Sequence, residues 1–137
     1  MISMLFGTIA GQERDTVTHR GTVAGAVVVN CGGVGYGVRL GPKDASTVKH
    51  GKSVTVFCRQ VFRENDLPLL FGWFNERDRA LFDSLLKING CGPVTACNVV
   101  DVFDVDELRA ADPAAIARRV DGVGKVMAQR IYDAVKA

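Results

Sequence analysis

The sequence predicts an α+β protein in which a small five-stranded β-barrel, residues 1–74, precedes an all-α tandem helix-hairpin-helix domain, residues 75–137. Three observations favour this architecture. Short segments rich in Val, Ile, Phe and Thr alternate with Gly, Pro, Asp and Asn in the first half. From Asn75 onward, apolar residues recur at helical spacing. In the second half, a Gly-apolar-Gly pattern occurs twice, thirty-two residues apart, at 90–92 and 122–124.

The first half contains five expected strands, which lie near residues 5–10, 23–31, 36–40, 54–62 and 69–74. Five short strands in a segment of this size predict a closed barrel, with the oligonucleotide/oligosaccharide-binding (OB) barrel as the leading candidate. The glycine-rich stretch 32–37 is no dinucleotide-binding fingerprint, because a strand follows it where a helix should open. We interpret it as a tight turn or a bulge of the barrel.

The second half contains five expected helices. The starts of the first four are indicated by capping residues or prolines, and the last is expected to begin near Lys125. The indicating residues are Asn75, Pro93, Asp104 with Glu107, and Asp112 with Pro113. The first helix carries an apolar stripe from Leu81 to Ile88, and the last is expected to run from 125 to 137. Each Gly-apolar-Gly pattern then lies between two helices, which is the arrangement of a helix-hairpin-helix unit.

The two hairpins match in register: Gly90, Gly92 and Ala96 correspond to Gly122, Gly124 and Ala128. Glycines allow positive φ and a close backbone approach, and the small alanines let the two helices of each unit pack tightly. The turn leaves the first N–H groups of the following helix without partners, so an anion is favoured there. We expect this anion to be a phosphate of DNA.

Charge is concentrated at the second hairpin, although the helical half is not basic overall. Residues 75–137 carry nine Lys and Arg against ten Asp and Glu. The net charge of this half therefore does not attract DNA by itself. The predicted DNA-binding residues of the second hairpin are Gly122, Gly124, Lys125, Arg118, Arg119 and Arg130. Those of the first hairpin are Gly90, Gly92, Thr95 and Lys87. The first hairpin is expected to bind less tightly because Lys87 is its one nearby cation, and neither hairpin is expected to read base sequence.

Catalysis, metal binding and membrane insertion are not expected. The four cysteines lack zinc-ligand spacing, and no phosphate-binding loop of an ATPase is present. The acidic residues near 101–107 could suggest a divalent-metal nuclease site, but two of them suit a helix start better. No segment reads as a signal peptide or membrane span. We therefore expect a cytoplasmic protein with no cofactor, no metal and no catalytic residues.

Several further segments resemble the RuvA family of bacterial Holliday-junction-binding proteins over nearly the whole chain. They are Met1-Ile2, residues 33–36, Arg63-Glu64, residues 69–72, Glu76-Arg77 and Leu81-Phe82, in addition to the hairpins. The resemblance implies a homotetramer that holds a four-way junction open, with its hairpins on the minor-groove backbone of each arm. It also implies that Glu64 and Asp66 form an acidic pin at the junction centre, and that a RuvB-like branch-migration ATPase is a partner.

The sequence departs from the family pattern in four places. About ten extra residues fall within 11–25, and one extra residue falls within 63–71, so that Asn65 separates Glu64 from Asp66. Val94 and Thr95 follow Pro93 where a basic residue is common in the family. The linker and third helical domain that engage the family's motor ATPase do not occur in this sequence, so the usual docking domain of that partner is missing.

The leading hypothesis is a non-catalytic, structure-selective DNA-binding protein for four-way junctions. One alternative is a general tandem helix-hairpin-helix adaptor that delivers a nuclease or another enzyme to duplex DNA. A second is a short regulatory paralogue that competes with a full-length relative. Oligomeric state and preference for branched DNA would separate the first two, and binding to a branch-migration ATPase would test the third.

Overall fold

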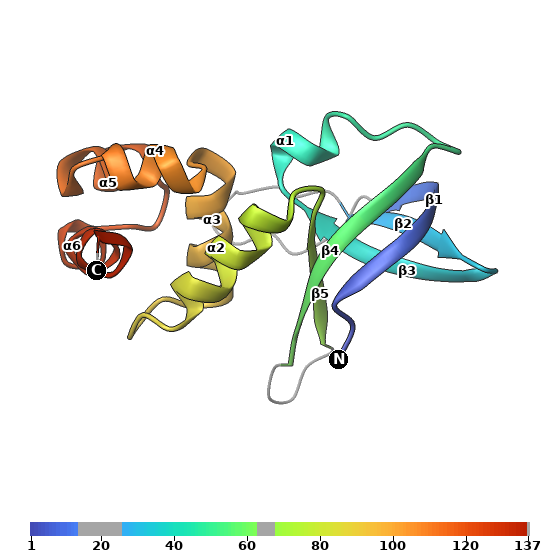
Figure 1. Ribbon diagram of the computed structural model, residues 1–137, viewed down its shortest axis with the longest axis horizontal. Helices are drawn as coiled ribbons and strands as arrows, with labels where there is room; N and C mark the ends of the chain where they lie inside the picture. Colours follow the sequence, from blue (N-terminus) through green and yellow to red (C-terminus); the bar gives the residue numbers. More distant parts are fainter. Residues whose placement is uncertain (14–25, 63–67, 137) are drawn as a thin grey trace. The chain divides into compact units, whose positions relative to one another are not determined.

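A closed barrel of five strands occupies the N-terminal unit, Met1–Arg79, in the computed structural model, which describes residues 1–13, 26–62 and 68–136 (Figure 1). The strands are β1 (Met4–Glu13), β2 (Ala26–Cys31), β3 (Val34–Leu40), β4 (Ser53–Val61) and β5 (Leu69–Trp73). Their order is β1-β2-β3-β5-β4, and β1 pairs with β4 to close the ring. The β3–β5 pair is parallel and the others are antiparallel. This confirms the predicted OB-type barrel.

Strand β1 pairs with two neighbours along its length. Its first part, Met4 to Thr8, pairs with β4, and its second part pairs with β2 from Thr8 to Glu13. The register shifts between Ile9 and Gly11, and such a bulge bends a strand and increases its twist. One long strand can therefore close a small barrel.

The glycine-rich stretch contains the turn between β2 and β3. Gly32 and Gly33 connect the two strands, and the Gly33 N–H donates a hydrogen bond of 2.8 Å to Asn30 Oδ1. The sequence did not predict the helix that follows β3, α1 (Pro42–Ala45), because one turn is too short for apolar periodicity to reveal it. Asp44 Oδ2 of this helix accepts a hydrogen bond of 3.1 Å from the Phe74 N–H, which ties α1 to the end of β5.

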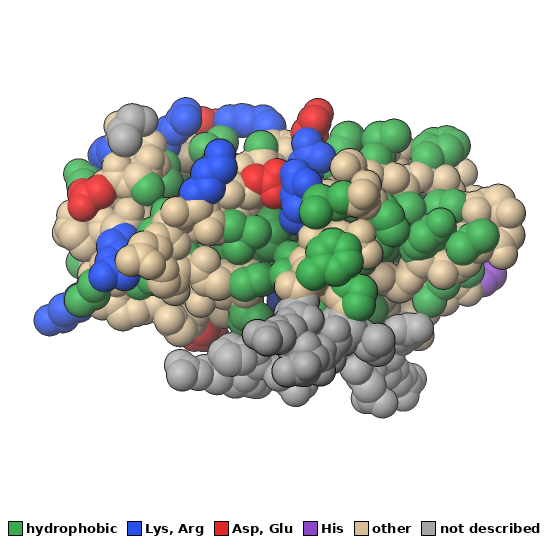
Figure 2. All heavy atoms as spheres, turned by 90° about the horizontal axis from the view of Figure 1, so that it is seen from below, with side chains coloured by type: hydrophobic (Ala, Val, Ile, Leu, Met, Phe, Trp, Pro, Cys, Tyr) green, Lys and Arg blue, Asp and Glu red, His purple; other side chains and the backbone are tan. Residues whose placement is uncertain are grey.

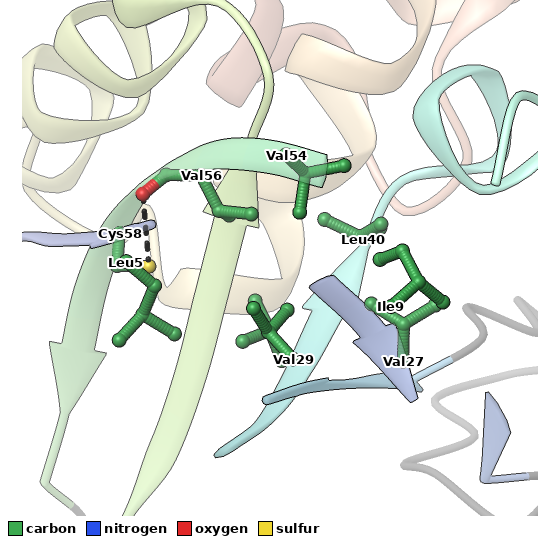
Figure 3. Packing of buried hydrophobic residues seen from close by; sticks show 9 residues of the cluster. Leu5, Ile9, Val27, Val29, Leu40, Val54, Val56 and Cys58 are labelled. Atoms are coloured by element: carbon green, nitrogen blue, oxygen red, sulfur yellow. Dashed lines mark hydrogen bonds between the residues drawn. The ribbon is translucent and has the colours of Figure 1, made fainter. Parts of the chain in front are cut away.

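The barrel interior is filled by side chains from alternate strand positions (Figure 3). The cluster comprises Leu5, Ile9, Val27, Val29, Val38, Leu40, Val54, Val56 and Cys58. A Cβ atom on the buried Gly72 would overlap the Val38 and Val56 side chains, so the packing leaves room only for glycine there. The Cys58 thiol lies inside this cluster, and burial raises its pKa to about 11.

Five helices make up the rest of the chain: α2 (Glu76–Leu86), α3 (Pro93–Val102), α4 (Val105–Ala110), α5 (Pro113–Arg119) and α6 (Lys125–Lys136). This confirms the predicted all-α segment with its two hairpins. The C-terminal unit is Ala80–Ala137, so α2 begins in the first unit and continues into the second. The core of the second unit includes Phe82, Leu85, Ala96, Val99, Phe103, Leu108, Ile116, Ala128 and Ile131, each at most 1% exposed.

The predicted capping residues lie at helix starts. The Asn75 side chain accepts a hydrogen bond of 2.8 Å from the Arg77 N–H at the start of α2. Asp104 and Glu107 form a reciprocal capping box at α4, with bonds of 2.7 and 3.3 Å. Asp112 accepts from the backbone of the first turn of α5 at 2.8 Å. Side chains therefore satisfy backbone donors at three of the helix starts.

Candidate nucleic-acid interface

The two hairpin turns repeat each other in the backbone. Gly90 has φ +85° and Gly122 has φ +80°, a region that side-chain-bearing residues rarely adopt. The first turn is closed by a bond from the Cys91 N–H to Ile88 O at 3.0 Å, and the second by the matching bond from the Val123 N–H to Val120 O at 3.4 Å. The thirty-two-residue register seen in the sequence is therefore a structural repeat.

Each turn is followed by a helix whose N-cap position holds a glycine, which has no side chain to accept a hydrogen bond from the first backbone N–H groups. At α3, the N-cap is Gly92, no side chain caps the helix, and the first helical bond runs from the Ala96 N–H to Gly92 O at 2.9 Å. At α6, the matching bond runs from the Ala128 N–H to Gly124 O at 2.9 Å. The N–H groups that precede these bonds carry the positive end of the helix dipole. An anion can therefore bind at either start, whereas carboxylates already occupy the starts of α4 and α5.

Two of the predicted cations come together beside the second turn. Arg118, from the last turn of α5, and Lys125, from the first turn of α6, line one surface depression with Pro113, Ala114, Ala117 and Gln129. Both cations are exposed, and neither forms an ion pair with any residue that the structure describes. Its apolar and cationic lining residues suit the sugar and phosphate groups of a nucleic-acid backbone.

Arg119 contacts a buried aromatic ring, whereas Arg118 lines the surface depression. Its guanidinium carbon lies 4.3 Å from the centroid of the Phe103 ring, which is 1% exposed at the end of α3. This is the geometry of a cation–π interaction. Arg119 therefore contributes to the packing of the helical unit in addition to its charge.

Arg130 reaches the first turn although its helix belongs to the second hairpin. Its Nη1 donates a hydrogen bond of 3.0 Å to the backbone oxygen of Asn89. A Cβ atom built on Gly90 would lie 3.1 Å from the same nitrogen. Lys87 lines the depression over this turn. The first turn therefore has two cations close to it, where the sequence alone indicated one.

Sequence reasoning missed Asn98, a polar residue on α3 that is only 8% exposed. Its Nδ2 donates a hydrogen bond of 3.2 Å to the backbone oxygen of Asp121 in the second turn. Its Oδ1 is buried and has no hydrogen-bond partner in the described part of the chain. The repeat register pairs position 98 with position 130 and could have indicated that the two are equivalent. The turn that each side chain reaches is a tertiary property that periodicity does not contain.

Other predicted residues give less information. Thr95 is half-buried in the first turn of α3. Glu64 and Asp66, the predicted acidic pin, lie outside the described residues.

Within the described ranges, no group of three or more His, Cys, Asp or Glu side chains could hold a metal ion. Among the helices of these same ranges, none combines the length and the hydropathy that a membrane span requires.

Figure 2 shows how side-chain types are distributed on one face of the molecule. Basic side chains are spread over the helical unit, and hydrophobic side chains are exposed on the barrel. The exposed apolar residues include Met4, Phe6, Val34 and Phe62 of the barrel unit, and Phe6 is 69% exposed. On the face that Figure 2 shows, the barrel therefore offers more apolar surface to a partner than its charged residues alone would suggest.

Two family models match consecutive parts of the chain. The RuvA N terminal domain matches residues 1–72, and the SAM-like Helix-hairpin-helix tandem matches residues 82–137. The first match covers more than half of the chain and includes most of the barrel.

Curated proteins named Holliday junction branch migration complex subunit RuvA are similar to this chain. The protein of Synechococcus sp. is 41% identical over 108 residues, which are 77% of this chain and 50% of that protein. That of Pseudomonas putida is 36% identical over 141 residues, with 99% and 63% covered. That of Corynebacterium aurimucosum is 31% identical over 144 residues, with 100% and 66% covered. The chain therefore spans about half to two thirds of the length of these curated relatives.

Proposed function

Because this chain belongs to the RuvA family, we propose that it is a non-catalytic, structure-selective DNA-binding protein that recognises four-way (Holliday) junctions. The observation that carries the proposal is the pair of repeated turns, each followed by a helix start open to an anion. In this proposal residues 1–74 act as an assembly platform and residues 75–137 as the DNA-binding domain. A cytoplasmic location is part of this proposal, because the proposed ligand is DNA.

The proposed contact is between backbone amides and phosphate oxygens. Backbone N–H groups at the starts of α3 and α6 donate to phosphates, and Arg118 and Lys125 add charge at the second turn. Such contacts position a protein on DNA without reading its bases. Selectivity for a junction must then come from the arrangement of several copies around the branch point.

The platform is proposed to assemble as a homotetramer. Met4 and Phe6 on β1 are 55% and 69% exposed, and they pair with Phe57 and Thr55 on β4. Apolar side chains gathered on one barrel face favour burial against another protein surface. A second copy is the proposed occupant, because symmetric assembly would multiply the hairpins that face one DNA junction.

Glu64 and Asp66 are proposed to act as the acidic pin at the centre of this assembly. They lie between β4 and β5 in the sequence, and both carry negative charge beside a ligand that is itself anionic. Carboxylates oppose DNA binding unless cations elsewhere hold the arms. Removing them is therefore expected to change how the junction is opened and to preserve the overall affinity.

A branch-migration ATPase is the proposed motor partner, since the relatives are named as subunits of a branch migration complex. A pull-down of the ATPase with this chain tests the proposal. The regulatory alternative instead predicts weak or no binding to the ATPase, together with competition against a full-length relative for junction DNA.

A gel-shift comparison tests the proposed function. A four-way junction and a linear duplex of the same arm sequence are titrated with the protein at several salt concentrations, and the protein mass is measured by sedimentation. We expect tighter binding to the junction and a tetrameric mass. Equal affinity for both DNAs together with a monomeric mass would favour the adaptor alternative. When one positive charge is removed at Arg118 or Lys125, Arg109→Gln, an exposed change on α4, is the matched control.

A further inference from the structure

Two hydrogen bonds cross between the hairpins in a reciprocal way. Arg130, on the helix that follows the second turn, donates to Asn89 O in the first turn at 3.0 Å. Asn98, on the helix that follows the first turn, donates to Asp121 O in the second turn at 3.2 Å. A side chain of each hairpin therefore donates a hydrogen bond to the backbone of the turn in the other hairpin.

The repeat register shows that this crossing is symmetric. Positions 98 and 130 are thirty-two residues apart, as are positions 89 and 121. Each donor is nine residues beyond the acceptor position of its own hairpin, yet it bonds to the equivalent acceptor in the other hairpin. Two different side chains, an amide and a guanidinium, make the same contact.

Both acceptors lie at the residue that precedes the positive-φ glycine. Fixing the carbonyl of Asn89 or Asp121 fixes the peptide plane at the entry to the turn. The N–H groups that follow take their direction from that plane. The spacing and orientation of the two proposed phosphate sites are therefore coupled through these bonds.

We propose that Asn98 and Arg130 are a reciprocal pair of positioning residues that lock the two hairpin turns into one rigid phosphate-binding unit. This inference rests on the proposed function for the identity of the ligand. Arg130 has a second role in it, because a guanidinium carries five donors and only one is used at Asn89. The guanidinium as a whole also supplies positive charge to the first turn from across the repeat.

The test measures amide hydrogen exchange in the full chain without DNA. The reporters are the Cys91 and Val123 N–H groups, which close the two turns. Arg130→Met keeps most of the side-chain length but removes the donor, and we expect it to speed exchange at Cys91 about three- to tenfold. Asn98→Leu is expected to speed exchange at Val123 by a similar factor. Arg130→Lys, which retains a donor, is expected to restore slow exchange at Cys91.

Arg109→Met is the matched control, because it removes an exposed arginine of α4 from the same unit. It is expected to leave both reporters unchanged. The inference is overturned if Arg130→Met acts equally on both turns, acts only on Val123, or acts on neither. Since Asn98 is buried and its variant could unfold the unit, the exposed Arg130 provides the decisive measurement.

Binding to DNA gives a second readout. Asn98→Leu removes no charge, so we expect weaker junction binding with an unchanged dependence on salt. Arg130→Met is expected to weaken binding and also to reduce the slope of log affinity against log salt by about one. If the wild-type protein shows no preference for junctions, the proposed function fails, but the exchange result still decides whether the turns are locked.

Discussion

Arg119 stacks on Phe103, with its guanidinium carbon 4.3 Å from the centroid of a ring that is almost fully buried. The preceding residue, Arg118, instead lines an exposed depression together with Lys125. Two arginines that the sequence groups into one basic cluster therefore have separable roles. Arg119 stabilises the packing of α5 against the end of α3, and Arg118 is available to a ligand.

The first prediction separates these two arginines. Arg119→Ala is expected to lower the free energy of unfolding by about 0.5–1 kcal/mol, because it removes the cation–π contact. Arg118→Ala is expected to leave the unfolding midpoint within error and to reduce the salt slope of DNA binding by about one. Chemical denaturation and filter binding at several salt concentrations measure the two effects. Equal losses of DNA affinity without any loss of stability in Arg119→Ala would contradict the assignment.

The second prediction concerns the four hairpin glycines. At Gly92 and Gly124 a Cβ atom would meet nothing within 4 Å. Gly92→Ala and Gly124→Ala are therefore expected to fold with a loss of at most about 1 kcal/mol, mainly from the poorer helix N-cap. Both are expected to weaken DNA binding, because the added methyl group lies where a phosphate must approach the backbone.

Gly90→Ala and Gly122→Ala are the comparison for that test. Their positive φ makes alanine unfavourable by about 1–2 kcal/mol irrespective of the DNA. Thermal unfolding should therefore distinguish the two pairs before any DNA is added. The interpretation is wrong if alanine at Gly92 or Gly124 costs as much stability as alanine at Gly90 or Gly122.

The third prediction concerns the start of α4. Asp104→Ala removes one half of the capping box and is expected to destabilise the helical unit by about 1 kcal/mol. DNA affinity is expected to stay unchanged, and added Mg²⁺ or Mn²⁺ should produce no cleavage of DNA. Cleavage that requires Asp104 and a divalent ion would instead support the nuclease alternative.

The fourth prediction follows from the pKa of Cys58. Burial raises this pKa from 9.0 to about 11, so the folded state retains a proton that the unfolded state loses. The free energy of unfolding should therefore fall as pH rises from about 9 to about 11. Cys58→Ala should flatten that part of the curve, although the smaller side chain lowers stability at every pH. Denaturant titrations at a series of pH values measure the difference in slope.

Much of the architecture could be predicted from the sequence because local chemistry specifies it. The capping box of Asp104 and Glu107, the proline at the start of α3 and the glycine pair between β2 and β3 each act within a few residues. The repeat of the hairpins was equally visible, since identical turn requirements select glycine at the same positions. The sequence also showed the cations of the proposed interface.

The long-range contacts of the Arg130 and Asn98 side chains could not be predicted. Arg130 contacts a residue forty-one positions away, and Asn98 contacts one twenty-three positions away. Such contacts depend on how the helices pack, and no pattern of apolar spacing contains that information. For the same reason, the sequence undercounted the positive charge at the first turn.

The ring of strand pairing in the barrel limits how copies of this chain can associate. Because β1 pairs with both β2 and β4, and β3 pairs with β5 at Arg39 and Leu40, each described strand is paired on both sides over part of its length. Little strand edge is therefore left to which a second molecule could add a strand of its own. Self-association through the barrel is expected to use side chains on its outer wall, so the same surface residues would set both solubility and assembly.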